Sequence, residues 1–410
     1  MERYESYKDS GVKWIGEIPS HWGMYKLKYL FKLNKTKNVG NKCNTILSLS
    51  YGKIKIKQDL NEGLTPESYE GYQLLNEGDI VIRSTDLQND HTSLRTGLVK
   101  NDGAITSAYI GLKNLDKKKY DSRYYHYFLH DWDITKAIYN EGKGLRQSLN
   151  WDDIKNMLLP ELDINEQTAI ANYLDSVTSK IDEAISQQQK MIDLLNERKQ
   201  IIIQNAVTKG LDPNVKMKDS GVEWIGEIPE DWEVIRMRYL CKITTGNKDT
   251  INRVEDGIYP FYVRSPKVER INTYTFDGEA ILMAGDGVGA GKIFHYVNGK
   301  FGCHQRVYIF YNIKIINGLF LFYYLKSLFK HTIEQLSAKS TVDSVRLNMI
   351  QDFLVAIPSN KEQLGIISYL QKACKKIDSS ISQCNQMITL LQERKQIIIN
   401  DVVTGKVKVV

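Results

Sequence analysis

Basic and amide side chains gather in loop-like segments of this 410-residue chain, and their chemistry suits contact with DNA. Arginine can form two hydrogen bonds to guanine, asparagine or glutamine can form two to adenine, and lysine contacts phosphate. In the first half of the chain the candidates are Lys53, Lys55, Lys57, Arg83, Ser84, Thr85, Arg95, Lys143, Arg146 and Gln147. In the second half they are Arg264, Lys267, Lys292, His304, Gln305, Arg306, Lys339 and Arg346. These residue types predict a DNA-binding surface in each half.

The lysines at 53, 55 and 57 alternate with other residues, so a strand here would place three ammonium groups on one face. Such a row could follow DNA phosphates, or it could be the solvated face of a sheet. A surface Lys or Arg needs no functional explanation by itself. The candidates therefore gain weight only from the organisation of the rest of the chain.

Signatures of an enzyme are missing from the sequence. A DNA adenine methyltransferase would need an N/D-P-P-Y/F tetrapeptide, and no two of the eight prolines are adjacent. The segment Gly285 to Lys292 is similar to a phosphate loop, but Asp286 stands where the pattern needs glycine and Ile293 where it needs Ser or Thr. We interpret it as a glycine-rich turn between strands. Since H-E-x-x-H and G-x-S-x-G motifs are also missing, the sequence favours a binding protein over an enzyme.

Composition and charge describe a soluble globular protein. Hydrophobic residues make up 42% of the chain and charged residues 25%, and the length predicts two to three domains. The five cysteines are scattered, so neither a disulfide framework nor a zinc site is predicted. A net charge of +6 permits an acidic partner but is a weak indication at this length. Because the start is polar and no long apolar run occurs, we expect a cytoplasmic protein without membrane contact.

An internal repeat organises the chain. The segment KDSGVKWIGEIPSHWGMYKLKYL, Lys8 to Leu30, returns as KDSGVEWIGEIPEDWEVIRMRYL at Lys218 to Leu240. A second segment that begins at Glu166 returns at Glu362, and both of its copies contain ERKQIII. We call these repeated segments the frame, and a chain with such a repeat must be divided at the repeat before its fold is interpreted.

The residues enclosed by the frame differ almost completely. Residues 31–165 and 241–361 share little sequence, although the segments around them are nearly identical. Neutral drift after a duplication is one explanation, but drift would erode the frame as well. We therefore expect one common partner surface, formed by the frame, and two different ligands. The division is a first domain at 1–160, a first helix at 161–211, a second domain at 212–357 and a second helix at 358–410.

The repeats that begin at Glu166 and Glu362 are predicted to be long helices. Their apolar residues recur at alternating spacings of four and three, a 3.5-residue period typical of a coiled-coil seam. Two such helices can bury their seams on one another when they lie antiparallel about a pseudo-two-fold axis. Polar seam members such as Gln188, Arg198 and Arg394 could fix the register. In the first helix the seam is Ile170, Leu174, Val177, Ile181, Ala184, Gln188, Met191, Leu195, Arg198 and Ile202.

The regions between the helices are predicted to be α+β domains. Short β-branched and aromatic runs broken by Gly, Asn and Asp predict strands, and one stretch in each region has helical spacing. The expected strands include 79–83, 104–112, 280–283 and 306–311, and the expected helices are 120–139 and 316–336. The predicted fold is therefore α+β, with two globular domains separated by two long helices that form an antiparallel coiled coil with a pseudo-two-fold internal repeat.

The whole arrangement resembles the specificity subunits of type I restriction-modification systems. The resemblance covers nearly the entire chain and rests on three features. These are the SGVxWIGEIPxxW segments (10–22 and 220–232), the stretches that lead into Glu-Gln (158–167 and 354–363) and the ERKQIII helix ends. It implies that each variable domain is a target recognition domain that reads one half of a bipartite asymmetric DNA site. It also implies that the helices form a spacer and dock two modification subunits.

The resemblance places the chemistry in partner subunits. Modification (methyltransferase) subunits would use S-adenosylmethionine, and restriction or motor subunits would use ATP and magnesium, so this chain would be non-catalytic and hold no metal. Segments 143–148 and 339–346 correspond to loops that family members bring toward DNA, which makes Arg146 and Arg346 the leading base-contacting candidates. Two alternatives stay open, a coiled-coil adaptor that binds proteins without DNA and an enzyme.

Overall fold

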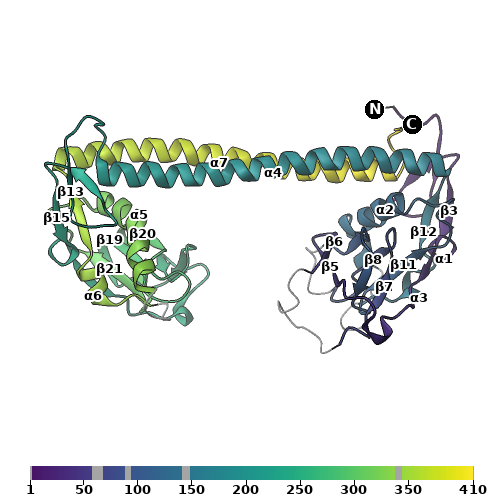
Figure 1. Ribbon diagram of the computed structural model, residues 1–410, viewed down its shortest axis with the longest axis horizontal. Helices are drawn as coiled ribbons and strands as arrows, with labels where there is room; N and C mark the ends of the chain where they lie inside the picture. Colours follow the sequence, from purple (N-terminus) through teal and green to yellow (C-terminus); the bar gives the residue numbers. More distant parts are fainter. Residues whose placement is uncertain (1, 58–67, 88–93, 141–147, 338–343, 410) are drawn as a thin grey trace. The chain divides into compact units, whose positions relative to one another are not determined.

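The computed structural model describes residues 2–57, 68–87, 94–140, 148–337 and 344–409. By their internal contacts, the residues form two compact units (Figure 1). Unit 1 comprises residues 1–188 and 386–410, and unit 2 comprises residues 189–385. Each unit therefore contains one mixed α/β domain, the beginning of one long helix and the end of the other.

The domain of unit 1 (domain 1) consists of short strands and one substantial helix. Its strands are β1 (Tyr7–Asp9), β2 (Glu17–Pro19), β3 (Gly23–Lys26), β4 (Phe31–Leu33), β5 (Leu47–Ser50), β6 (Lys53–Ile56), β7 (Gln73–Leu75), β8 (Ile80–Ile82), β9 (Thr96–Leu98), β10 (Gly103–Ile105), β11 (Ile110–Asn114) and β12 (Leu158–Glu161). Its helices are α1 (Leu27–Leu30), α2 (Ser122–Ile134) and α3 (Trp151–Ile154), with 3-10 turns η1 (Val39–Asn41) and η2 (Ala137–Asn140). The long helix α4 follows at Ile164–Lys209.

The domain of unit 2 (domain 2) has longer strands and a longer helix. Its strands are β13 (Met217–Asp219), β14 (Glu227–Pro229), β15 (Glu233–Arg236), β16 (Lys242–Thr245), β17 (Tyr259–Tyr262), β18 (Glu269–Ile271), β19 (Phe276–Ala284), β20 (Phe294–Cys303), β21 (Val307–Tyr311) and β22 (Leu354–Ile357). Its helices are α5 (Gly318–Ser337) and α6 (Leu347–Gln351), with η3 (Met237–Tyr239) and η4 (Thr250–Asn252). The second long helix, α7, spans Asn360–Val403.

Both domains are built on the same antiparallel sheet, although the residues enclosed by the frame are unrelated in sequence. The sheet of domain 1 has the order β4-β11-β8-β9. In domain 2 the order β16-β21-β19-β20 repeats it, and β17 and β18 extend the edge, with β17 parallel to β20. The α+β prediction is confirmed, and the two domains share a topology that their residues did not reveal.

One predicted strand, residues 104–112, is divided in the structure into β10 and β11 with a turn between them. The buried side chain of Gln73 holds this turn, because its amide nitrogen donates to the carbonyls of Thr106 (3.1 Å) and Tyr109 (2.7 Å). The prediction of one continuous strand was wrong because a run of apolar residues does not show a turn that a distant side chain stabilises.

The frame closes each domain around the start of a long helix. In domain 1, β3 pairs with β12, the strand that leads into α4, and in domain 2, β15 pairs with β22 in the same register. The buried Trp22 donates its ring N–H to Glu166 on α4 (3.1 Å). Likewise, the buried Trp232 donates to Glu362 on α7 (3.0 Å). The repeated tryptophan and glutamate therefore make the same contact twice.

A buried glutamine beside each glutamate joins the long helix to its domain. The side-chain oxygen of Gln167 accepts from the amide of Asp121, the N-cap of α2 (2.8 Å), and its nitrogen donates to two backbone carbonyls (2.7 and 3.1 Å). Gln363 makes the matching contacts with the amide of Asn317, directly before α5 (2.6 Å), and with the carbonyl of Pro358 (2.9 Å). Each glutamine thus links the first turn of a long helix to the start of the domain's own helix.

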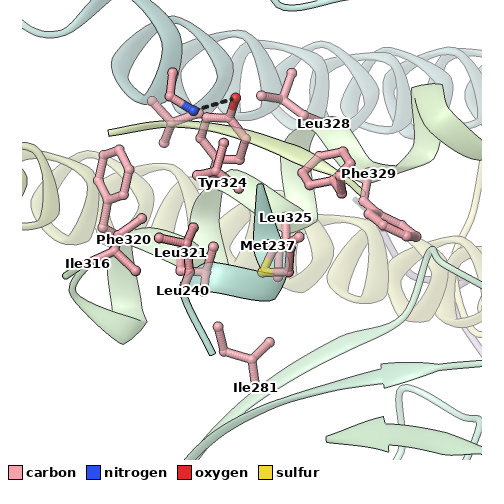
Figure 2. Close-up of a cluster of buried hydrophobic side chains, with 14 of the residues drawn as sticks. Met237, Leu240, Ile281, Ile316, Phe320, Leu321, Tyr324, Leu325, Leu328 and Phe329 are labelled. Atoms are coloured by element: carbon pink, nitrogen blue, oxygen red, sulfur yellow. Dashed lines mark hydrogen bonds between the residues drawn. The ribbon is translucent and has the colours of Figure 1, made fainter. Parts of the chain in front are cut away.

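The aromatic face of α5 fills the core of unit 2 (Figure 2). Phe320 and Tyr324 are completely buried, and the amide of Ala356 in β22 donates to the Tyr324 hydroxyl (3.1 Å), as the dashed line in Figure 2 shows. The same cluster includes Ile203 of α4 and Leu370 of α7. Domain 2 and the helices beside it therefore share one hydrophobic core, which holds the domain against them.

The buried stripe of the long helices departs from the predicted 3.5-residue period. In α4, Ile181, Ile192 and Ile203 are buried at intervals of eleven residues, which corresponds to about 3.67 residues per turn. The predicted seam residue Met191 is 49% exposed, and Arg198 is exposed as well. Their placement in the seam was wrong because a helix near its natural pitch turns a strict heptad gradually off the buried face.

Two equivalent ion pairs connect the helices. Within each unit the end of one long helix packs with the beginning of the other, so the helices run antiparallel. In unit 1, Lys395 of α7 contacts Asp182 of α4 (2.6 Å), and in unit 2, Lys199 of α4 contacts Asp378 of α7 (2.6 Å). These residues are counterparts in the repeat, so the same pair forms twice with the helices exchanged. The lysine of each ERKQIII segment therefore forms an ion pair that fixes the register of the two helices, a role predicted for the arginine before it.

Replacement of Gln167 by alanine should destabilise unit 1. The substitution would leave the Asp121 amide and two carbonyls without their partners, so the free energy of unfolding should fall by about 2–4 kcal/mol, measured by urea denaturation. The control is Gln189→Ala at an exposed position of the same helix, which should change this free energy by less than about 0.5 kcal/mol. Equal effects of the two substitutions would contradict the assigned role.

Candidate nucleic-acid interface

Two predicted DNA-contacting arginines of domain 2 meet at one carboxylate. Arg264 follows β17, Arg306 lies between β20 and β21, and both side chains are exposed. Their Nη1 atoms lie 2.9 and 2.6 Å from the two carboxylate oxygens of Asp286, in the turn after β19. Although burial by itself would raise the pKa of Asp286, hydrogen bonds from Arg306 and Arg264 lower it below its ordinary value. Asp286 is therefore an ionised bridge between two guanidinium groups.

Gln305 and His304 lie beside this bridge but face different surroundings. Gln305 is exposed, and its side-chain nitrogen donates to Asp249 (2.8 Å). His304 is only 3% exposed, and its Nδ1 accepts from the amide of Arg306 (3.0 Å). Burial first, and then the positive charge of Arg264, lower the pKa of His304. The prediction of His304 as a DNA contact is therefore corrected, because its neutral ring shapes the turn from beneath the surface.

Arg346 lies next to the same glycine-rich turn. The residue before it, Val345, donates its amide to the carbonyl of Gly285 (2.8 Å), and Arg346 is exposed at the start of α6. Lys292 is exposed at the other end of the turn. Because β19 ends before Gly285 and β20 begins after Lys292, the interpretation of this segment as a turn between strands is confirmed. The structure thus brings predicted residues from four separate segments to one turn.

The turn after β8 is the counterpart of the glycine-rich turn in domain 1. β8 and β19 hold the same place in the two sheets, and the carbonyl of Ser84 accepts from the Leu149 amide (2.9 Å), as in the matching contact of domain 2. Arg83 and Thr85 are partly exposed in this turn, whereas Ser84 is buried. Arg83, Ser84 and Thr85 therefore lie at the place in domain 1 that corresponds to the Asp286 turn of domain 2, where Arg264 and Arg306 meet; we call these two arginines the arginine cluster.

Arg95 supports this turn from the interior. Its side chain is 0% exposed, and its guanidinium donates to the carbonyls of Arg83 (3.3 Å), Thr85 (2.7 Å) and Asp86 (3.0 Å). The prediction that Arg95 contacts DNA is corrected by this burial, because a side chain whose donors meet backbone carbonyls inside the domain does not reach a ligand. Arg95 instead fixes the conformation of the turn that carries Arg83.

Lys53 and Lys55 lie on the outer face of the β5–β6 hairpin. Both are exposed, and Ile54 between them packs against a hydrophobic cluster of domain 1. Lys53 contacts Asp182 of α4 (3.3 Å), and Lys57 is half-buried beyond the end of the strand. The row of lysines is therefore shorter than expected, and one member is partly neutralised by a helix carboxylate.

Four predicted residues lie outside the described residues, namely Lys143, Arg146, Gln147 and Lys339. They stay predictions. Lys267, which is exposed after β17, joins no contact with the arginine cluster among the described residues.

Asp286 is the residue that sequence reasoning missed. In the sequence it appears only as a departure from the phosphate-loop pattern, yet exposed arginines close together in a folded domain need a counter-charge. An acidic residue in a glycine-rich turn could have indicated one. Among the described residues no three His, Cys, Asp or Glu side chains are grouped to hold a metal ion, and no described helix is long and apolar enough to cross a membrane.

Fold and surface together define a duplicated chain, in which two unlike domains expose arginine side chains at or beside equivalent turns. Comparison with known proteins then shows what the chain is similar to. The family model of the type I restriction modification DNA specificity domain matches residues 229–389. The type I restriction enzyme EcoDI specificity subunit of Escherichia coli is 31% identical over 181 residues, which cover 44% of this chain and 40% of that subunit. The match to this relative thus spans less than half of its length.

One further relative and one solved structure match over almost the whole chain. The putative type I restriction enzyme MjaX specificity subunit of Methanocaldococcus jannaschii is 27% identical over 441 residues, covering 98% of each chain. A solved chain from work on the assembly and conformational transition of the type I R-M system has a TM-score of 0.69 at 13% identity and covers 95% of this chain and 99% of its own, which shows the fold. The chain is thus similar to type I restriction-modification specificity subunits, at 31% identity over 44% of its length and at 27% identity over 98% of it.

Substitution of Arg95 by lysine separates a structural role from a DNA contact. Lysine keeps the charge that a phosphate contact needs, but it cannot reach three carbonyls as a guanidinium does. We expect Arg95→Lys to lower the free energy of unfolding by about 1–3 kcal/mol, measured by urea denaturation. The exposed Lys55→Ala should change it by less than about 0.5 kcal/mol. Unchanged stability together with weakened DNA binding would return Arg95 to the DNA surface.

Proposed function

We propose that this chain is the DNA-specificity subunit of a type I restriction-modification complex, in which each domain reads one half of a bipartite asymmetric site. The observation that supports it most directly is the contrast between a nearly identical frame and two unlike turns at equivalent places. Domain 2 presents Arg264, Arg306 and Arg346, whereas the turn of domain 1 presents Arg83 and Thr85. Unlike side chains at equivalent positions suit two unlike half-sites. The adaptor alternative leaves these clusters without a role.

The helices expose a second apolar stripe, which we assign to partner docking. In unit 2, α4 exposes Met191, Leu194 and Ile201 to 49%, 60% and 50%, and in unit 1, α7 exposes their repeat counterparts Met387, Leu390 and Ile397 to 46%, 59% and 60%. Apolar residues that recur along one exposed helix face are typical of a surface for another helix. Because the two stripes consist of the same residue types, we propose that each docks one copy of the same modification subunit.

In this proposal the chemistry belongs to the partners. Modification subunits would bind S-adenosylmethionine, and restriction or motor subunits would use ATP and magnesium for translocation and cleavage. The residues of this chain would bind and position double-stranded DNA through guanidinium, ammonium and amide donors. Such a complex acts on the DNA of the cell, so we propose a cytoplasmic location.

Exchange of residues 31–157 for the insert of another specificity subunit tests the proposal. The exchange leaves β3 and β12 in place, so the new domain should form on the same helix start. In cells that contain the partner subunits, one half of the methylated site should change and the other half should stay. Sequencing that detects methylated adenine across the genome gives the readout. Methylation at the original, unaltered site would refute the assignment of domain 1 to one half-site.

The substitutions Leu194→Asp and Leu390→Asp should each disable one docking stripe. A carboxylate buried without a partner opposes association, so we expect affinity for one of the two modification subunits to fall about 100-fold. Native mass spectrometry should then find one bound copy for each single variant and none for the double variant. The control is Leu364→Asp, because Leu364 is 59% exposed on α7 but its repeat counterpart is Thr168, outside the stripes. Two copies bound by each single variant would contradict the docking assignment.

A further inference from the structure

We propose that Asp286 is a positioning residue that fixes Arg264 and Arg306 as one two-pronged donor for a guanine in the half-site read by domain 2. This inference rests on the proposed DNA-reading function and adds to it the chemistry of one recognised base pair. It starts from the placement of the carboxylate between two arginines that come from different strand ends.

The bridge uses only part of the hydrogen-bonding capacity of each arginine. Oδ1 of Asp286 accepts from Nη1 of Arg264 (2.9 Å), and Oδ2 accepts from Nη1 of Arg306 (2.6 Å). A guanidinium has five N–H donors, and within the described part of the chain neither arginine side chain makes another hydrogen bond. The side chain of Asp286 is 19% exposed, against 41% for Arg264 and 61% for Arg306. The carboxylate of Asp286 is thus largely buried, and the unused N–H donors of Arg264 and Arg306 lie on exposed side chains.

Asp286 itself is unsuited to accept from a base. A carboxylate could take a hydrogen bond from the amino group of cytosine, but here both oxygens are already bonded to arginines. Guanine presents two acceptors in the major groove, O6 and N7, and arginine is its usual partner. The exposed donors of this cluster therefore fit guanine, and the role left to Asp286 is to hold them in place.

The backbone holds Asp286 where both arginines can reach it. The amide of the preceding residue, Gly285, donates to the carbonyl of Arg306 (2.9 Å), and its carbonyl accepts from Val345 (2.8 Å). A Cβ on Gly285 would lie 2.9 Å from the ring of Tyr308, so this close approach requires glycine. Hydrogen bonds to Arg306 and from Val345 therefore hold the turn at Gly285, and they fix the position of Asp286, the next residue.

A carboxylate that orders two guanidinium groups favours specificity over affinity. Side chains that are already ordered lose less conformational freedom when they bind, and they meet a base edge in one geometry. Without the carboxylate, both arginines gain freedom and two uncompensated charges, which suit phosphates at any sequence. Loss of Asp286 should therefore weaken the discrimination between bases more than it weakens binding to DNA.

The test uses the full chain in complex with its modification subunits. The methylated site is first mapped for the wild-type complex, and the half-site read by domain 2 is the half that survives the exchange of residues 31–157. Synthetic duplexes that replace each base pair of that half are then methylated by wild type and by Asp286→Asn. At one G·C pair, we expect the preference for the original base to fall about tenfold in the variant. Binding to unrelated DNA should be unchanged or stronger, with a steeper salt dependence.

Asp352→Asn is the matched control, because Asp352 of the same unit also contacts two arginines, Arg236 (3.4 Å) and Arg238, and both of these arginines lie in the frame and away from the glycine-rich turn. It should leave base preference unchanged. If Asp286→Asn does not fold, Arg306→Lys, which keeps the charge and loses the planar fork, should lower the same preference at the same base pair. Unchanged preference in both variants, or an equal loss in the two half-sites, overturns the inference. A wild-type complex that methylates no specific site would instead refute the proposed function.

Discussion

A buried tryptophan N–H and a glutamate on the first turn of a long helix meet twice in this chain, and most of the structure depends on that contact. An indole N–H that leaves water needs an acceptor, and the helix start provides one. The neighbouring glutamine then ties the helix to the domain's own helix through three hydrogen bonds in unit 1. An inserted domain has only to begin after β3 or β15 and to end at the paired strand, β12 or β22. This requirement explains how two unrelated sequences occupy the same frame.

Local patterns in the sequence were enough to predict much of this architecture. The long helices, the α+β class and the glycine-rich turn follow from periodicity, composition and backbone conformational preference. The buried face of the helices did not follow, because periods of 3.5 and 3.67 residues agree over the first turns and separate only later. Met191 belongs to the seam under the first period and to the surface under the second, and only packing decides between them. The common sheet of the two domains also lay beyond reach, since strand pairing joins distant residues.

The candidate site shows the same limit for side chains. Residue type identifies a donor, but it does not tell whether the donor faces a ligand or the protein's own carbonyls. Arg95 and Arg264 are alike as residues, yet one is enclosed by backbone oxygens and the other is exposed beside a carboxylate. What separates them is the number of acceptors within reach, which is a property of tertiary structure. A buried arginine and an exposed arginine thus serve equivalent turns in opposite ways.

The exposed stripes on α4 and α7 have a consequence for how the two halves evolve. A partner that docks on both stripes is subject to selection at two places at once, so a compensating change in the partner must suit both copies. Substitutions in one stripe are then removed unless the other stripe follows, and the two copies stay alike. The proposed docking sets no such common requirement for the turns of the two domains, so these turns would diverge independently. On the docking proposal, the likeness of the two long helices follows from a shared partner, and the divergence of the domains follows from the lack of a shared partner at their turns.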